Sequence, residues 1–352
     1  MTTRTLPTPD AEATPAPTRR MTSASLARLV RRPEMGSFVG LVAVLAFFGV
    51  FGGTTFLGLG GTASWLNVAG EIGIIALPVG LLMIAGHLDL SVGSVIPASS
   101  ITIALVSGTF GAPILVGIAA ALGLGLLIGL INGILVVRTD LPSFVVTLAT
   151  LFAVAGLTLG LSIILAGSTS VSLRAGPVAK TMLGQFLGGM FQVTILWWVL
   201  AAVVTGYILH GSRYGNWIFA TGGDKESARN AGIPTASLTV ALFAASGVAA
   251  AFVGMGQAIL YNSAQVSAGQ SYIFNSIIAV VIGGVLLTGG YGSVIGIVLG
   301  TLTFAIVNQG IYYTGFDANW ASLIIGVLLL AAVLLNKTFR NLALAAPSER
   351  ER

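Results

Sequence analysis

Ten long apolar runs, separated by Gly, Pro or charged residues, dominate this chain of 352 residues. A helix needs about 20 mostly apolar residues to cross a bilayer, and most of the runs approach or exceed that length. The runs cover residues 38–57, 65–86, 92–107, 112–137, 142–165, 192–211, 236–260, 271–287, 292–313 and 320–336. They predict an all-α polytopic membrane protein with about ten transmembrane helices. A re-entrant short run would reduce the number to eight or nine, and residues 86–92 are either a loop or a re-entrant break.

The composition excludes several other classes of protein. Only 8% of the residues are charged and 55% are hydrophobic, whereas a soluble domain carries roughly 25% charged residues. A soluble globule and a nucleic-acid binder are therefore not expected. The chain has no Cys, which removes disulfides, thiol nucleophiles and Cys-based metal sites. We expect no bound metal.

The basic residues predict an orientation, because cytoplasmic loops of membrane proteins are enriched in Lys and Arg. With the amino terminus inside, only Arg174 and Lys180 fall outside. The inside then receives Arg19, Arg20, Arg28, Arg31, Arg32, Arg138, Arg213, Lys225, Arg229, Lys337 and Arg340. Both termini are predicted to be cytoplasmic. Residues 1–37 read as a disordered cytoplasmic tail, 38–340 as the transmembrane domain and 341–352 as a second cytoplasmic tail.

Glycine recurs at a spacing of four residues in two of the runs. The two series are Gly125, Gly129 and Gly133, and Gly292, Gly296 and Gly300. Small residues at this spacing let helix backbones approach closely in lipid. The spacing predicts close packing within the helix bundle, with a subunit interface as the alternative.

Catalytic motifs are missing from the sequence. A nucleotide-binding loop would end in Gly-Lys-Ser or Gly-Lys-Thr, but the three Lys residues follow Ala179, Asp224 and Asn336. There is no His-Glu-x-x-His motif either. We therefore expect no catalytic residue, and a multi-span chain of this kind is expected to move a solute across the bilayer.

The most polar internal stretch, residues 212–235, encodes a short helix. Asp224 can cap its first amides, and Glu226 and Arg229 lie at the ends that the helix dipole favours. Gly232 provides a left-handed stop and Pro234 prevents continuation. From local chemistry alone this is either an ordinary interfacial helix or a helix that docks on another protein.

Four separated motifs give the chain a resemblance to a known family. Glu226-Ser227-Ala228 followed by Gly232 resembles the Glu-Ala-Ala-x-x-x-Gly loop of ATP-binding-cassette (ABC) importer permeases, with Ser in place of the middle Ala. The remaining motifs resemble those of the ribose/xylose/arabinose-type sugar permeases. They are residues 86–94 (GHLDLSVGS, in which His87 departs from the pattern), Asn132-Gly133 with 141–148 (LPSFVVTL), and 213–224.

The resemblance implies a role and a set of partners. In this family the short helix docks on a cytoplasmic ATPase subunit, which implies that the coupling residues here are Asp224, Glu226, Ser227, Ala228, Arg229 and Gly232. It implies two ATPase subunits that hold ATP and Mg, so that this chain binds no cofactor. It also implies an extracytoplasmic sugar-binding protein and a second permease subunit, identical or related, in the cell (inner) membrane.

Two carboxylates fall at membrane depth, where such groups are costly and rarely face lipid. Asp89 lies with Ser91 in a polar break, and it serves there as a helix cap, as a contact for substrate hydroxyls or as a proton relay. Glu71 shares a helix face with Asn67. This face either lines a polar translocation path or makes a buried structural hydrogen bond. The full set of candidates for the substrate path is Asn67, Glu71, Asp89, Ser91, Asn132, Asn275, Asn308 and Gln309.

A second function remains open at this point. An ion-coupled secondary sugar carrier would use Asp89 or Glu71 to carry the coupling proton. Such carriers also contain broken helices near the bilayer midplane. The loop at 212–235 favours the ABC importer permease.

Overall fold

The computed structural model describes residues 34–315 and, beyond them, positions 317, 320, 323, 326, 327, 330, 331 and 334. Of the tail predicted at 1–37, residues 1–33 lie outside the described residues, and residues 35–37 belong to the first described helix. The tail predicted at 341–352 lies wholly outside the described residues. The predicted span at 320–336 lies largely outside them as well.

Eight helical segments within the described residues are long and apolar enough to cross a membrane. They are α2 (Met35–Leu57), α3 (Leu59–Ile84), α4 (Val92–Ile103) with its π-helical end η1 (Ala104–Thr109), α5 (Ile114–Thr139), α6 (Ser143–Ala166), α8 (Thr194–Gly206) with the π-helical η2 (Tyr207–Gly211), α11 (Thr235–Tyr261), and α13 (Val294–Gly310) with the 3₁₀ turn η3 (Ile311–Tyr313). The all-α polytopic fold is confirmed, and eight of the ten predicted spans match these helices.

The run at 271–287 differs from the prediction. Its helix, α12 (Gln270–Ile282), has 13 residues, fewer than the roughly 20 that a spanning helix needs. It stops at two glycines, and Gly284 has φ 89°, a conformation that only glycine adopts at no steric cost. The chain then turns through 284–293 before α13 begins.

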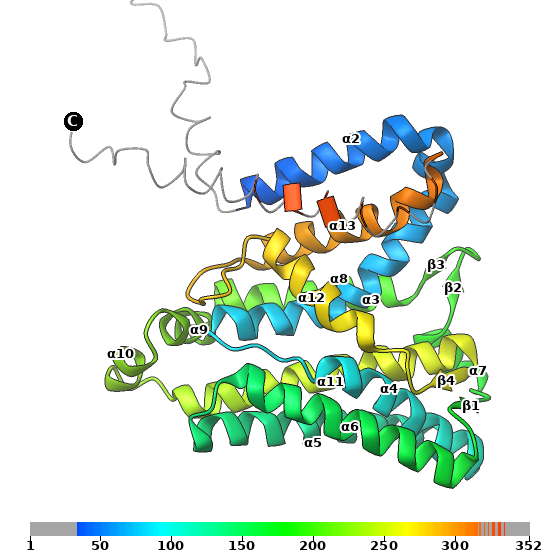
Figure 1. The fold of residues 1–352 in the computed structure, drawn as a ribbon, viewed down its shortest axis with the longest axis horizontal. Coiled ribbons are helices and arrows are strands. Elements are labelled where there is room, and N and C mark those ends of the chain that lie inside the picture. Colours follow the sequence, from blue (N-terminus) through cyan, green and yellow to red (C-terminus); the bar gives the residue numbers. More distant parts are fainter. Residues whose placement is uncertain are drawn as a thin grey trace, which may run out of the picture.

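The remaining elements lie at the two ends of the bundle (Figure 1). One end carries α9 (Arg213–Gly223) and α10 (Lys225–Asn230), and the other carries α7 (Pro177–Leu183). Two small antiparallel pairs also lie at the α7 end, β1 (Ser170–Ser172) with β4 (Ser263–Gln265), and β2 (Phe186–Leu187) with β3 (Phe191–Gln192).

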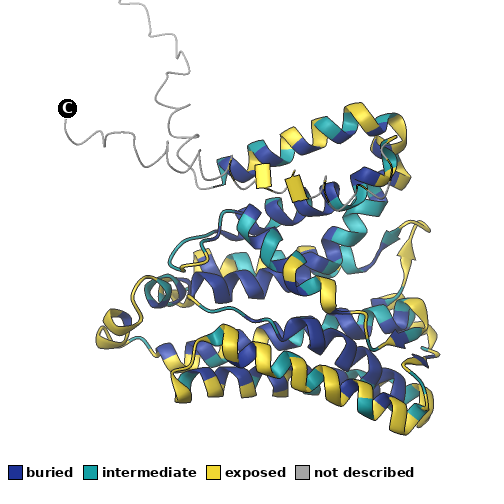
Figure 2. Cartoon of the chain, in the orientation of Figure 1, coloured by how far each residue is buried: buried dark blue, intermediate teal, exposed yellow. Residues whose placement is uncertain are grey.

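The core is built from helices that are buried over most of their surface. In α3 and α4, 83% and 72% of the most apolar window is buried, against 11% in α6 and in α8. Helix α11 packs against α3, α4 and α5, and α13 packs against α2, α3 and α12. Figure 2 shows this division, with buried residues through the middle of the bundle and exposed ones along α5 and α6. The exposed apolar surfaces are those expected to meet lipid.

Close helix contacts occur at the glycines with a spacing of four. A Cβ on Gly129 would lie 2.8 Å from Ala244 Cα, and one on Gly133 would lie 2.7 Å from Val240 Cα. In the second series, a Cβ on Gly300 would lie 2.8 Å from Gly283 Cα. The prediction of close packing within the bundle is therefore confirmed for both series.

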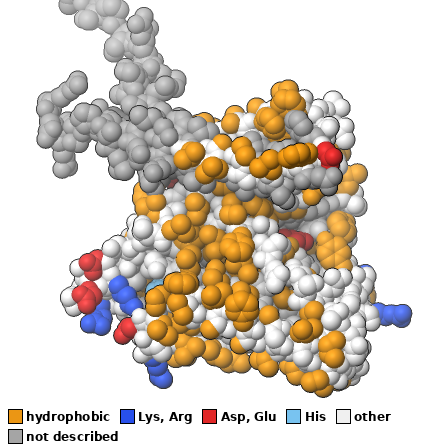
Figure 3. Space-filling view, viewed as in Figure 1, with side chains coloured by type: hydrophobic (Ala, Val, Ile, Leu, Met, Phe, Trp, Pro, Cys, Tyr) orange, Lys and Arg blue, Asp and Glu red, His pale blue; other side chains and the backbone are white. Residues whose placement is uncertain are grey.

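Charged residues gather at the two ends of the bundle. Arg138, at the end of α5, lies at the same end as Lys225 and Arg229 of the α10 region, which we call the basic end. Arg174 and Lys180 lie at the opposite end, beside β1 and α7. Figure 3 shows basic and acidic side chains at the α10 end, a basic side chain at the opposite end and patches of hydrophobic side chains across the face between them.

Candidate functional site

Helices α9 and α10 form a helical hairpin at the basic end (Figure 1). Ser212 caps α9 by accepting a hydrogen bond from the Tyr214 amide at 3.2 Å. Of the residues of α10, only Ala228 is buried. Helix α10 therefore presents nearly all of its surface outward.

Local chemistry accounts for the shape of α10. The Asp224 carboxylate accepts a hydrogen bond from the Ser227 amide at 2.8 Å, and this bond keeps the pKa of Asp224 below its usual value. At the other end Gly232 has φ +83°, and the Ile233 amide donates to the Ala228 carbonyl at 3.1 Å. The predicted cap, short helix and glycine stop are confirmed.

Gly222 seats this hairpin on the core. Its α-carbon lies so close to the end of α3 that a Cβ there would overlap the Ile84 carbonyl oxygen and would lie 2.7 Å from the Gly290 amide. The Gly290 amide in turn donates to the same Ile84 carbonyl at 2.8 Å. Three backbone segments, from α9, the end of α3 and the turn at 284–293, thus meet directly.

Asp89 lies in the non-helical segment 85–91 that joins α3 to α4, and its side chain is fully buried. One carboxylate oxygen accepts from the Ser91 amide at 2.9 Å and from its hydroxyl at 2.6 Å. The other accepts from the Ser246 hydroxyl at 2.7 Å. Asn132 donates to Ser91 at 2.8 Å and accepts from Thr150 at 2.7 Å. This polar network joins the segment to α5, α6 and α11, and it satisfies backbone and side-chain groups that lipid would leave unpaired.

We predict that Asp89→Asn retains most of the stability and that Asp89→Ala does not. An Asn amide oxygen can accept both bonds from Ser91, and its NH₂ can donate to Ser246. Ala leaves three buried donors without an acceptor, at about 1–3 kcal/mol each. The apparent melting temperature of the protein in detergent measures the difference. A proton relay at Asp89 instead requires Asp89→Asn to lose nearly all transport while remaining folded.

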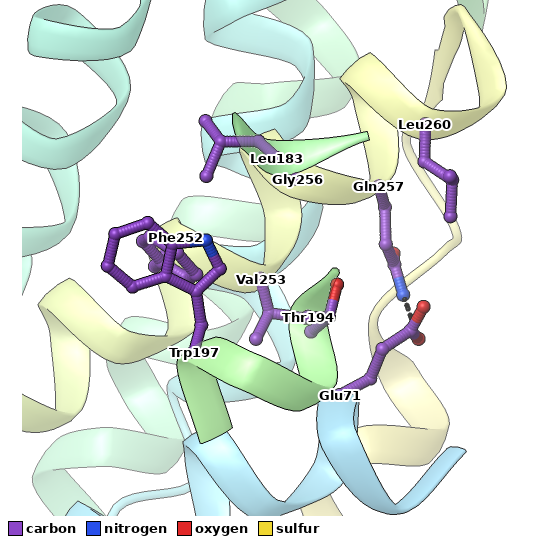
Figure 4. Close-up of a pocket in the computed structure, with 9 residues that line it drawn as sticks. All are labelled: Glu71, Leu183, Thr194, Trp197, Phe252, Val253, Gly256, Gln257 and Leu260. Atoms are coloured by element: carbon purple, nitrogen blue, oxygen red, sulfur yellow. Dashed lines mark hydrogen bonds between the residues drawn. The ribbon is translucent and has the colours of Figure 1, made fainter. Parts of the chain in front are cut away.

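A second polar cluster surrounds Glu71 of α3. One oxygen of its carboxylate accepts a hydrogen bond from Gln257 of α11 at 2.9 Å, and the same oxygen accepts one from the Tyr272 hydroxyl of α12. Gln257 also donates to Tyr272 at 2.6 Å. Three helices are thus joined through a single carboxylate, as Figure 4 shows for Glu71 and Gln257.

The space beside Glu71 is almost closed. The pocket lined by Glu71, Gln257 and Thr194, with Trp197 and Phe252 as an apolar wall, encloses about 10 Å³. This is near the smallest volume that holds one water. The pocket is therefore too small to hold a molecule the size of a monosaccharide.

The other path candidates lie apart from these two clusters. Asn67 fixes the β2–β3 hairpin to α3, since it accepts from the Gln192 amide at 2.8 Å and donates to the Met190 carbonyl at 2.9 Å. Gln309 joins α13 to α3 by accepting from Ser64 at 2.9 Å, and it donates to Asn308 at 2.9 Å. Asn275 is partly buried in α12 and makes no side-chain hydrogen bond to another described residue.

Several residues that form hydrogen bonds with the path candidates were not predicted from the sequence. They are Thr150, Gln192, Ser246, Gln257 and Tyr272. One signal was present, because Ser246 and Gln257 are about three turns apart and so share a face of α11. Gln192, whose backbone amide binds Asn67, has a buried side-chain oxygen without a hydrogen-bond partner among the described residues.

His87 lines a 360 Å³ pocket at the basic end together with Asp140, Ser143 and Lys225. Its Nε2 lies 3.4 Å from the Thr239 hydroxyl. Burial, and then the charge of Lys225, lower the pKa of His87 from 6.5 to about 4. The imidazole is therefore neutral at pH 7.

We predict that this histidine makes the fold sensitive to acid. Its pKa is lower in the folded than in the unfolded chain, so the unfolded chain binds more protons between the two values. The stability contributed by neutral His87 is complete above pH 6.5 and is lost as the pH falls toward 4. His87→Gln should therefore show a smaller drop in apparent melting temperature from pH 7.5 to about 5.5. Equal drops in the two proteins would refute this role.

Comparison with known proteins agrees with this architecture. Residues 61–333 match a family described as branched-chain amino acid transport system / permease component. The fructose import permease protein FrcC of Rhizobium meliloti is 30% identical over 323 residues, which cover 88% of this chain and 87% of that protein. The galactose/methyl galactoside import permease protein MglC of Escherichia coli is 31% identical over 316 residues, which cover 86% of this chain and 94% of that protein. The probable ABC transporter permease protein y4mJ of Sinorhizobium fredii is 35% identical over 266 residues, which cover 75% of this chain and 77% of that protein.

No solved structure is significantly similar to the chain. The family match nevertheless extends over most of the sequence and over all the described spanning helices except α2 and the first residues of α3. The chain is therefore a multi-pass membrane permease and belongs to the branched-chain amino acid transport system / permease component family.

Proposed function

We propose that this chain is the transmembrane permease subunit of an ABC importer that carries a monosaccharide or a similar small polyol. The names of the relatives support the sugar class, since they include import permeases for fructose and for galactose and methyl galactoside. The observation that carries the proposal is the exposed, locally capped α10 at the basic end, seated by Gly222 on the end of α3.

In this proposal α10 is the helix that engages a separate ATPase subunit on the cytoplasmic side. Glu226, Ser227 and Arg229 are exposed on α10, and they are available for a partner because α10 buries only Ala228. Hydrolysis of ATP with Mg takes place on that partner, so this chain is not itself an enzyme. Movement of the ATPase reaches α3 through the backbone contacts of Gly222.

The substrate path runs through the interior helices, and the Glu71 cluster closes it in this conformation. Opening separates Glu71 on α3 from Gln257 on α11 and Tyr272 on α12, which exposes acceptors and donors to the cargo. Neutral amides and a hydroxyl suit a cargo that carries hydroxyl groups and no charge. The Asp89 network holds the non-helical segment 85–91 in place during this movement.

The complete importer in this proposal contains two permease subunits, because closed symmetric pairs are the common arrangement. The second subunit is another copy of this chain or a related permease. Two ATPases bind at the basic end, and an extracytoplasmic binding protein delivers the cargo at the opposite end. The complex resides in the cell membrane.

Reconstitution in proteoliposomes tests this proposal against an ion-coupled carrier. The chain is purified with its ATPase and binding protein, and uptake of labelled ribose, galactose or fructose is measured. We expect uptake that requires both partners and internal ATP. Uptake driven by a proton gradient, with no ATPase present, would overturn the proposal and support the carrier.

A further inference from the structure

A surface groove runs along the line where α5 meets α11 near the basic end. It has a volume of about 420 Å³ and is lined on α5 by Leu130, Ile134, Val137 and Arg138, and on α11 by Ala236, Ser237, Val240 and Ala241. Apart from Arg138 and Ser237 these side chains are apolar. The groove therefore suits a hydrocarbon chain.

The sequence explains why the groove is open. On α11 its wall consists mainly of small residues, Ala236, Ser237 and Ala241, which leave the larger side chains of α5 uncovered. The two helices are nevertheless in close contact at Gly133, where a Cβ would lie 2.7 Å from Val240 Cα. The groove is thus a furrow on the surface of two closely packed helices.

The groove continues into a polar mouth. A second pocket of about 370 Å³ shares Val137 and Ala236 with the groove. It is lined further by Lys225, Arg229, Asp140, Glu226 and Thr235. With Arg138 at the groove, three basic and two acidic side chains surround the mouth. None of the five forms an ion pair with another residue in the part of the chain that the structure describes.

The position of the mouth fits the boundary between membrane and water. Arg138 lies in the last turn of the spanning helix α5, and Thr235 is the first residue of the spanning helix α11. Basic pockets between transmembrane helices at the cytoplasmic side attract anionic lipid headgroups. A net positive mouth above an apolar furrow matches the two halves of such a lipid.

We infer that the groove between α5 and α11 binds an anionic phospholipid, with an acyl chain in the furrow and the phosphate at Arg138, Lys225 and Arg229. The lipid lies beside α10 and braces its base against α5. This site is separate from both polar clusters of the substrate path. It shares Arg229 with the surface of α10 proposed to engage the ATPase, and lipid binding is therefore measured without that partner.

Native mass spectrometry of the purified chain tests the inference, with neither cargo nor ATPase present. Phosphatidylglycerol, phosphatidylcholine or the soluble headgroup analogue glycerol 3-phosphate is titrated into the detergent solution. We expect phosphatidylglycerol to bind at least about tenfold more tightly than phosphatidylcholine, a difference of about 1.4 kcal/mol. We expect glycerol 3-phosphate alone neither to bind nor to compete.

Two variants locate the site. The first, the mouth variant, combines Arg138→Gln, Lys225→Gln and Arg229→Gln, which remove three charges from exposed side chains. In the second, Ala241→Phe fills the furrow and keeps every charge. Each should weaken phosphatidylglycerol binding at least about tenfold. The matched control, Arg174→Gln with Lys180→Gln at the opposite end, should bind as the wild type does.

Three outcomes would overturn the inference, provided that the variants elute as the wild type does in size-exclusion chromatography. The first is equal binding of phosphatidylglycerol by the mouth variant and by the control. The second is equal binding of the two phospholipids by the wild type. The third is displacement of phosphatidylglycerol by glycerol 3-phosphate, which would make the mouth a site for a free phosphate compound.

Discussion

Gly232→Val is expected to reduce ATP-driven uptake at least about tenfold while the permease remains folded in the membrane. Gly232 has φ +83° and no atom within 4 Å of a built Cβ, so the substitution causes backbone strain without a clash. A β-branched residue in this conformation is a marked outlier, and the strain displaces the end of α10 that the Ile233 amide closes. Because α10 contributes little to the core, the loss should appear in coupling rather than in stability.

Asn at the same position is the matched control, because Asn tolerates the left-handed conformation. Gly232→Asn should retain uptake. Glu226→Gln tests the partner contact itself, since the Glu226 side chain is exposed and makes no hydrogen bond to another described residue. It should lower ATP-driven uptake, whereas Asn230→Ala on the same helix should not. Normal uptake in both Gly232→Val and Glu226→Gln would exclude α10 as the coupling element.

Gly222→Ala is expected to destabilise the protein by about 1–3 kcal/mol or more, the usual range for an overpacked site. The added methyl group would overlap the Ile84 carbonyl oxygen and press on the Gly290 amide. Both neighbours are backbone atoms, so no side chain can rotate out of the way. The apparent melting temperature in detergent should fall, and any folded fraction should couple ATP hydrolysis to uptake poorly.

The adjacent glycine is a precise control for this substitution. Gly223 has no atom within 4 Å of a built Cβ and is exposed. Gly223→Ala removes a glycine from the same helix end without a clash, and its melting temperature should stay close to that of the wild type. If Gly222→Ala and Gly223→Ala behave alike, α9 does not pack on the end of α3 through Gly222.

The spanning helices could be predicted because length and hydropathy alone decide them. The runs that became α5, α6 and α11 are long, and their predicted ends lie within a few residues of the observed ones. Helix α12 was misjudged since its run stays apolar beyond Ile282, and only the conformation of the glycines that follow ends the helix. Hydropathy carries no information about that conformation.

The candidate sites also differ in how far the sequence could predict them. The helix at α10 was predictable because the cap at Asp224 and the stop at Gly232 act within one short segment. The polar clusters were predictable only in part. Asp89 and Glu71 are conspicuous in an apolar sequence, but their partners Ser246 and Gln257 lie on α11, more than 150 residues away. Which residues meet across such separations depends on how the helices pack.

The self-contained α10 has a consequence for engineering. Residues 224–232 close their own hydrogen bonds at both ends and bury only the Ala228 side chain. We therefore expect that this segment can be exchanged between related permeases without unfolding the helix bundle. Grafting the equivalent nine residues from a relative onto the α9 stem should redirect the permease to that relative's motor subunit, with the lipid-embedded body left as it is.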